Sequence, residues 1–174
     1  GRLKVPLFYF LLDESSKEKV KHILHIRDLK DMCVSSYYSQ YYSHSANHNI
    51  LIKRKNIISL RTYYDLFYKN KVIIHYINEI RNTRKYLSYK VVYYEDMVLD
   101  FENYVTDILS YLNVKSIDIK KHIVNSFKNE FKPEGAMKHK RSVLPGKGEV
   151  ELPSDICIEI NNLMNSFTIV GFLP

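Results

Sequence analysis

Residues 20–42, VKHILHIRDLKDMCVSSYYSQYY, decide the fold that we expect for this chain. Their first part predicts a β-strand that ends at Ile26, with apolar side chains on both faces, as in a strand covered on two sides. The part that follows places apolar and aromatic residues at helical spacing, with Asp28 or Asp31 as the N-terminal cap. A strand that leads through a short turn into a helix is the building unit of parallel α/β proteins.

The remaining sequence alternates in the same way. A second strand is predicted at residues 88–96, and helices are predicted at 54–68, 71–86, 101–114, 116–131 and 155–167. Residues 132–154 have no periodicity and predict a long loop. We expect a single α/β domain over residues 1–174, with a parallel sheet and flanking helices. Since two parallel strands are few for a stable sheet, we expect this domain to lack its N-terminal part or to borrow strands.

Composition narrows the class of protein. The 174 residues carry a net charge of +7, which favours anionic partners such as nucleotides, nucleic acid, sulfated sugars or a membrane surface. Cys33 and Cys157 lie in apolar settings and predict buried free thiols. No spaced Cys/His set indicates a zinc site, so we expect no metal.

No apolar stretch reaches the length of a membrane span. A cytoplasmic location is favoured weakly, and an anchor in a preceding part of the protein stays open.

Arg27 and Ser35 are the first candidate site residues. Arg27 follows the predicted strand, where parallel α/β proteins bind ligands, and Ser35 is expected on the first turn or so of the helix. An arginine fork, a hydroxyl and a helix N-terminus together suit a phosphate group. The alternative is that Arg27 pairs with Asp28 or Asp31 in its own loop, while Ser35 faces solvent.

The segment RDLKDMCVSSYY, residues 27–38, resembles the motif R-[DN]-P-x-D-x-x-x-S-x-Y of the sulfotransferase family. Arg27, Asp31 and Ser35 fall on its positions, and Leu29 stands where proline is common. In that family the arginine and the serine bind the 3′-phosphate of 3′-phosphoadenosine 5′-phosphosulfate, so the resemblance implies this role for Arg27 and Ser35. It also implies a fold like that of the P-loop NTPases.

Two further segments resemble the family in the same order. Residues 91–114, VVYYEDMVLDFENYVTDILSYLNV, resemble its YEDM motif, which implies that Tyr94 lies near the adenine. Residues 139–174 resemble its C-terminal loop and last helix, which implies that Arg141 and Lys147 contact phosphate. Val150 stands at the family's usual tryptophan, so this register is open by several residues. The resemblance covers about residues 3–174, the C-terminal two-thirds of a typical member.

Two parts of a complete site are not found in the sequence. No segment resembles the family's P-loop-like 5′-phosphosulfate loop, and PGKGE at 145–149 is no Walker loop, because no Ser or Thr follows its lysine. The family's catalytic histidine would fall near Lys4, so the base is unknown. His44 and His48 lie in a predicted loop that can reach an acceptor, and His139 neighbours Arg141.

The function that we predict is transfer of a sulfuryl group from 3′-phosphoadenosine 5′-phosphosulfate to a hydroxyl or amine acceptor. The partners are then this nucleotide sulfate donor and an unknown acceptor, with no nucleic acid expected. Whether the chain alone is active depends on the missing loop. The alternative is a non-enzymatic basic module that binds nucleic acid or acidic glycans. A third possibility is a degenerate sulfotransferase fold kept as a scaffold.

Overall fold

The computed structural model describes residues 20–43, 57–86, 89–127 and 143–169, and the fold is given for these residues. The strands are β1 (His22–Ile26) and β2 (Tyr89–Tyr93). The helical segments follow in chain order: α3 (Leu29–Tyr38), η1 (Ser39–Ser43), α5 (Leu60–Tyr63), η2 (Tyr64–Ile73), α6 (Ile74–Tyr86), α7 (Tyr94–Leu99), α8 (Phe101–Tyr111), α9 (Ile117–Phe127), α10 (Lys147–Glu151) and α11 (Ser154–Ile169). The segments η1 and η2 have the wider turns of a π-helix.

The two strands form a parallel sheet in register from His22 opposite Tyr89 to Ile26 opposite Tyr93. The predicted parallel α/β fold with flanking helices is therefore confirmed. The second strand is shorter than predicted, because the chain turns into α7 at Tyr94 instead of continuing to residue 96. This early turn brings Tyr94 to the same edge of the sheet as Arg27, since both residues directly follow the last residue of a strand.

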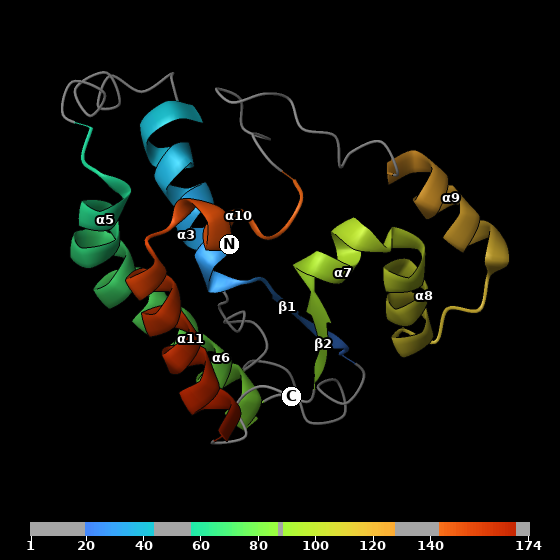
Figure 1. Cartoon of the computed structure of the whole chain (residues 1–174). Helices are drawn as coiled ribbons and strands as arrows, with labels where there is room; N and C mark the ends of the chain where they lie inside the picture. The colour runs from blue at the N-terminus through green and yellow to red at the C-terminus, as the bar shows by residue number, and fades with distance from the viewer. Residues whose placement is uncertain (1–19, 44–56, 87–88, 128–142, 170–174) are drawn as a thin grey trace.

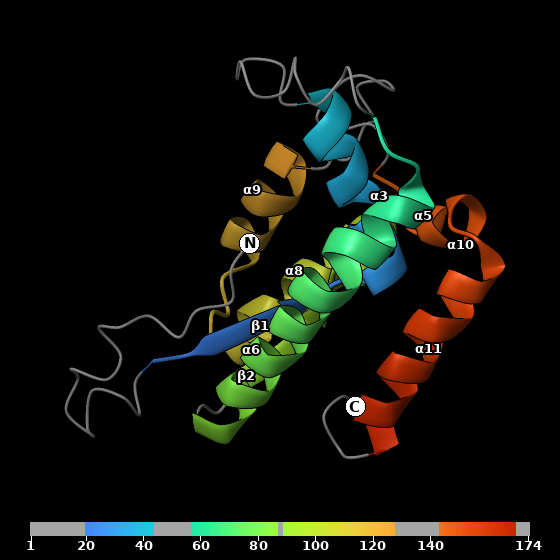
Figure 2. The ribbon, with the colours of Figure 1, turned by 90° about the vertical axis from the view of Figure 1, so that its left-hand side faces the viewer.

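Helices lie on both sides of the sheet. The helices α3, α5, α6 and α11 occupy one side, and α7, α8 and α9 occupy the other (Figure 1), and the view turned by 90° agrees (Figure 2). Leu24 and Ile26 of β1 are buried on the first side, where they pack against Ile80 of α6. The opposite face of β1 is only partly covered, so the expectation of two covered faces is wrong for the described residues. There Ile23 is 38% exposed, and His25 contacts the rings of Tyr94 and Tyr104.

Residues 60–86 form one uninterrupted helical run, not the two helices predicted at 54–68 and 71–86. Tertiary contacts are made at residues 68 and 69, where the two predicted helices were expected to be separate. The Tyr68 hydroxyl donates a hydrogen bond to the carbonyl of Leu29 (2.8 Å), and Lys69 forms an ion pair with Glu159 of α11 (2.6 Å). Tyr64 and Tyr68 are completely buried in the core between α3, η2 and α11.

The predicted loop at 132–154 contains a short helix in its described part. The chain turns at Gly146, whose φ of 91° is a conformation that favours glycine, and then forms α10 before α11 begins at Ser154. No helix in the described ranges is both long and apolar enough to cross a bilayer.

Candidate functional site

The turn between β1 and α3 is fixed by Asp28. Its carboxylate accepts hydrogen bonds from the backbone N–H groups of Lys30 (2.7 Å) and Asp31 (3.1 Å), and its carbonyl accepts from the N–H of Met32 (3.0 Å). Asp28 thus caps α3, as one of the two predicted alternatives states. The Asp28 N–H in turn donates to Glu95 of α7 (3.0 Å), which joins the two strand ends.

Arg27 presents its guanidinium beside this turn. The guanidinium carbon lies 4.2 Å from the centroid of the Tyr94 ring, a cation–π contact. The Arg27 backbone N–H donates to the hydroxyl of Tyr76 on α6 (3.4 Å), which fixes the start of the side chain. The side-chain Nε is buried and makes no hydrogen bond within the described chain. Since buried polar atoms in proteins are almost always hydrogen-bonded, this unsatisfied N–H is unusual and marks the Arg27 side chain as a candidate functional group.

The nearby acids do not neutralise Arg27. The carboxylate of Asp28 binds the turn, and Asp31, which is 3% exposed, accepts hydrogen bonds from the N–H groups of Gly146 (2.9 Å) and Gly148 (2.6 Å). No salt bridge joins Arg27 to any acid in the described ranges. The alternative in which Arg27 pairs with its own loop is therefore wrong for these residues.

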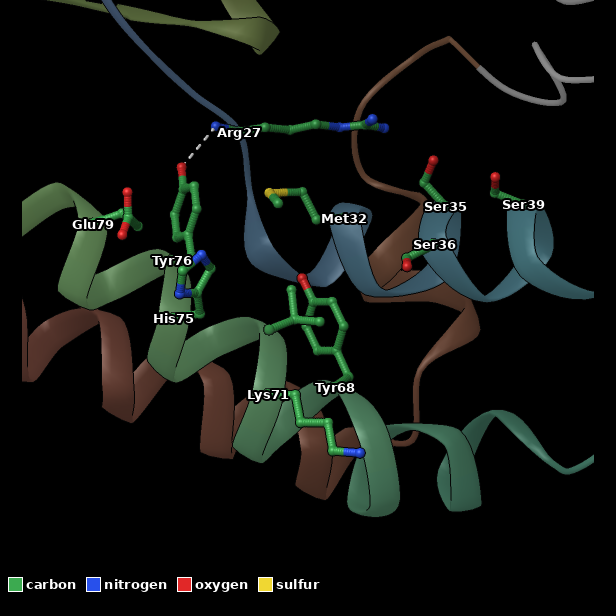
Figure 3. Close-up of a pocket in the computed structure, with 11 residues that line it drawn as sticks. Arg27, Met32, Ser35, Ser36, Ser39, Tyr68, Lys71, His75, Tyr76 and Glu79 are labelled. Carbon is green, nitrogen blue, oxygen red and sulfur yellow. Dashed lines mark hydrogen bonds between the residues drawn. The ribbon is translucent and has the colours of Figure 1, made fainter. Parts of the chain in front are cut away.

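Ser35 lies on the same cavity as Arg27. The two residues line a cavity of about 600 Å³ between α3 and the run η2–α6 (Figure 3). In Figure 3 the guanidinium end of Arg27 lies above the turn of α3 that carries Ser35, whose hydroxyl points to the same side. Ser35 is the seventh residue of α3 and so lies in its second turn, later than predicted. The N–H groups of Lys30, Asp31 and Met32 are already bonded to Asp28, so these three are not free to bind a ligand.

Tyr94 connects Arg27 to the C-terminal part of the chain. Its hydroxyl donates a hydrogen bond to the carbonyl of Val143 (3.0 Å). Burial raises the pKa of Tyr94, and the Arg27 cation opposes this rise, so the phenol stays a donor at neutral pH. His25 contacts the same ring at a centroid distance of 6.3 Å. Burial lowers the pKa of His25, which the Glu95 charge opposes and the Arg27 charge reinforces.

Of the other two predicted phosphate ligands, only Lys147 lies in the part of the chain that the structure describes. Lys147 is the first residue of α10, is exposed, and lies between the two glycines whose N–H groups bind Asp31. It is not among the residues that line the cavity of Arg27 and Ser35. Arg141 lies outside the described residues, as do His44, His48 and His139.

Two features of the site were not predicted. Tyr76 orients Arg27 through its hydroxyl, and Lys71, His75 and Glu79 line the far wall of the cavity. Their four-residue spacing places these three side chains on one helix face, which the predicted helix at 71–86 already implied. Nothing in the sequence indicates that this face borders a cavity, because the opposite wall comes from α3. Within the described ranges, no group of three His, Cys, Asp or Glu residues is arranged to bind a metal ion.

The carboxyl end of the first strand of a parallel sheet carries Arg27, which pairs with no acid in the described ranges and shares a cavity with Ser35 of α3. In parallel α/β proteins, this edge of the sheet is where ligands bind. The sequence model described as "Sulfotransferase domain" matches residues 3–150, which is most of the chain. The chain therefore belongs to the sulfotransferase domain family. No curated protein sequence matches it.

Among solved structures, the chain is similar to mouse sulfotransferase SULT7A1 complexed with PAP, with a TM-score of 0.60 and 17% sequence identity. The similarity covers 91% of this chain and 62% of the mouse chain, so the present chain spans less than two-thirds of that protein's length. At this identity the likeness confirms the fold.

Proposed function

We propose that this chain provides the 3′-phosphate-binding part of a sulfotransferase that uses 3′-phosphoadenosine 5′-phosphosulfate. One observation carries the proposal: Arg27, which no acid pairs with in the described residues, shares a cavity with Ser35 at the carboxyl end of β1. Family membership supports it, as does the fact that the similar mouse sulfotransferase is complexed with PAP. We also propose that residues 1–174 form one domain.

Each proposed ligand has a distinct role. Arg27 donates two parallel hydrogen bonds to the 3′-phosphate. A guanidinium binds phosphate in this two-bond geometry more specifically than an ammonium group does. Ser35 donates one further hydrogen bond from its hydroxyl. Tyr94 borders the adenine with the part of its ring that Arg27 leaves uncovered. Lys147 and Arg141 add positive charge from the C-terminal side of the site.

The proposed reaction is an in-line transfer of the sulfuryl group. A base removes the proton from an acceptor hydroxyl or amine, the acceptor atom bonds to sulfur, and the bond from sulfur to the 5′-phosphate oxygen breaks. The leaving adenosine 3′,5′-bisphosphate takes the electron pair, and cationic groups stabilise its developing charge, as in phosphoryl transfer. Arg27 and Ser35 act in this reaction by binding and orienting the donor. The base and the acceptor stay unassigned.

Calorimetry with two nucleotides tests the proposal. Adenosine 3′,5′-bisphosphate is expected to bind at least about tenfold more tightly than 5′-AMP, because each charge-assisted hydrogen bond contributes roughly 1.5–3 kcal/mol. Arg27→Ala is expected to abolish this preference, and Arg27→Lys to restore it only in part. Equal affinities of the unaltered protein for both nucleotides would contradict the proposal.

Arg61→Ala is the matched control. Arg61 is an exposed arginine of α5 that pairs with Asp65 and Asp155, so its removal lowers the net charge by the same amount without touching the cavity. Its nucleotide preference is expected to stay unchanged. A basic module for nucleic acid or glycans would instead show a steep loss of binding with salt and no preference for the 3′-phosphate. The comparisons give that alternative no support.

A further inference from the structure

Residues 143–148, here called the anchored segment, are bonded to the Arg27 site at both ends. At the first end, the Tyr94 hydroxyl donates to the carbonyl of Val143 (3.0 Å). At the other end, the N–H groups of Gly146 and Gly148 donate to Asp31 (2.9 and 2.6 Å). The anchored segment is separated from Asp31 by more than a hundred residues of sequence, so these contacts are purely tertiary.

Asp31 and the anchored segment are in close contact, with no room for a side chain at Gly148. Each oxygen of the Asp31 carboxylate accepts one of the two N–H groups, Oδ2 from Gly146 and Oδ1 from Gly148. A Cβ atom on Gly148 would lie 2.3 Å from the Lys30 carbonyl carbon and 2.5 Å from the Asp31 nitrogen, so only glycine permits this approach. Gly146 has a φ of 91°, which again favours glycine.

The charge of Asp31 opposes the binding of an anion nearby. Burial raises the pKa of Tyr94, and the negative charge of Asp31 raises it further. The charge of Asp31 therefore acts on Tyr94, whose ring contacts the Arg27 guanidinium. On electrostatic grounds alone, removing Asp31 would strengthen the binding of a phosphate group at this site. If Asp31 instead positions the site, its removal should weaken the binding of the phosphate group. An experiment can therefore separate the positioning role from the purely electrostatic effect.

We propose that Asp31 is a positioning residue of the nucleotide site, which rests on the proposed function. Asp31 does not touch the nucleotide. It fixes the anchored segment against α3. This contact sets the position of Lys147, which lies between the bonded residues Gly146 and Gly148. It also holds the Val143 carbonyl where it accepts the hydrogen bond of the Tyr94 hydroxyl. Recognition of the 3′-phosphate by Arg27, Ser35 and the anchored segment then depends on an acid that repels the same phosphate.

The test compares Asp31→Asn with Asp28→Asn by calorimetry. Both variants remove one negative charge from the same turn, but only Asp31 contacts the anchored segment. An asparagine accepts one of the two N–H groups and turns its own NH₂ toward the other. Asp31→Asn is expected to weaken adenosine 3′,5′-bisphosphate binding by roughly tenfold or more, while 5′-AMP binding changes little. Asp28→Asn is expected to leave the preference intact. Bisphosphate binding by Asp31→Asn that equals or exceeds that of the unaltered protein would overturn the proposal.

A second measurement uses the unaltered protein and so does not depend on whether a variant folds. Linkage is reciprocal, so if the anchored segment strengthens bisphosphate binding, the bisphosphate must strengthen the anchoring. The amide hydrogens of Gly146 and Gly148 are expected to exchange more slowly with solvent deuterium when adenosine 3′,5′-bisphosphate is added, and not with 5′-AMP. Unchanged exchange at both glycines would overturn the proposal.

The outcomes separate this proposal from the proposed function. If the unaltered protein shows no preference for the bisphosphate, the proposed function itself fails. If the preference is present and Asp31→Asn retains it, only the positioning role of Asp31 fails.

Discussion

Tyr94 shows how one side chain can serve two parts of a site. Its ring lies against the Arg27 guanidinium, and its hydroxyl binds the carbonyl of Val143. The ring contact orients a cation, and the hydroxyl contact orients a distant backbone segment. These two contributions can be separated, because phenylalanine keeps the ring and alanine removes both.

We expect Tyr94→Phe to lower the free energy of unfolding by about 0.5–1.5 kcal/mol, the usual contribution of one hydrogen bond. Tyr94→Ala is expected to lower the free energy of unfolding by at least about 0.5 kcal/mol more, because it also removes the cation–π contact. Urea unfolding followed by circular dichroism measures both values. A Tyr94→Phe variant as unstable as Tyr94→Ala would show that the ring contact contributes nothing.

The two cysteines give a second prediction at the residue scale. Cys33 and Cys157 are buried and unpaired, and burial raises the pKa of Cys33 to about 12. The thiolate is the reactive form, so neither thiol is expected to react with a soluble disulfide reagent at pH 8 in the folded protein. Both are expected to react within seconds to minutes once urea unfolds the chain. Rapid reaction of one thiol before unfolding would show that the core around α3 opens locally.

At the residue scale, sequence reasoning works where chemistry and spacing lie in one segment. Arg27 and Ser35 are eight positions apart in a strand–turn–helix unit, and the structure brings them to one cavity. The contact of Asp31 with Gly146 and Gly148 could not be predicted, because these partners lie 115 and 117 residues away. The proposed phosphate contacts themselves stay predictions.

At the scale of elements, α3 depends on its capping residue. Asp28 binds two N–H groups of the first turn, and Asp28→Ala is expected to lower the free energy of unfolding by about 0.5–2 kcal/mol. Asp118→Ala is the control, since Asp118 is an exposed acid in the first turn of α9, and we expect a change below about 0.5 kcal/mol there. Urea unfolding provides both values. Equal losses in the two variants would indicate a general effect of charge and not of the cap.

The existence of a helix was easier to predict than its breaks. For α3 the sequence offered Asp28 or Asp31 as the cap, and the structure has Asp28. The continuous helix through residues 69–70 instead includes Tyr68 and Lys69, which contact α3 and α11. The second strand ends early at Tyr93, although the sequence from Tyr94 onward still allows a strand. In both places the local sequence permits two conformations, so it does not decide the boundary by itself.

At the scale of the whole molecule, the parallel pairing of two strands with helices on both sides followed from the alternation of strands and helices. The packing of the C-terminal part did not. The core is closed by α11, from which Ile156, Cys157 and Ile160 pack beside Leu29 and Val34 of α3. The apolar spacing of α11 predicts that one face is buried, but it does not indicate which of the other helices covers that face.

This core makes the protein sensitive to alkaline pH. Burial raises the pKa of Cys33 and of Tyr76 to about 12, and it raises the pKa of Tyr64 and Tyr68 as well. In the unfolded chain, a cysteine titrates near pH 8.5 and a tyrosine near pH 10. The folded state therefore keeps protons that the unfolded state releases. The stability from these groups is fully present below about pH 8.5 and is lost as the pH rises toward 12.

We expect the free energy of unfolding in urea to fall steadily between pH 8.5 and about 11, and Tyr76→Phe to reduce the slope above pH 10. A free energy that stays constant across this range would mean that these hydroxyls and this thiol are solvated in the folded protein.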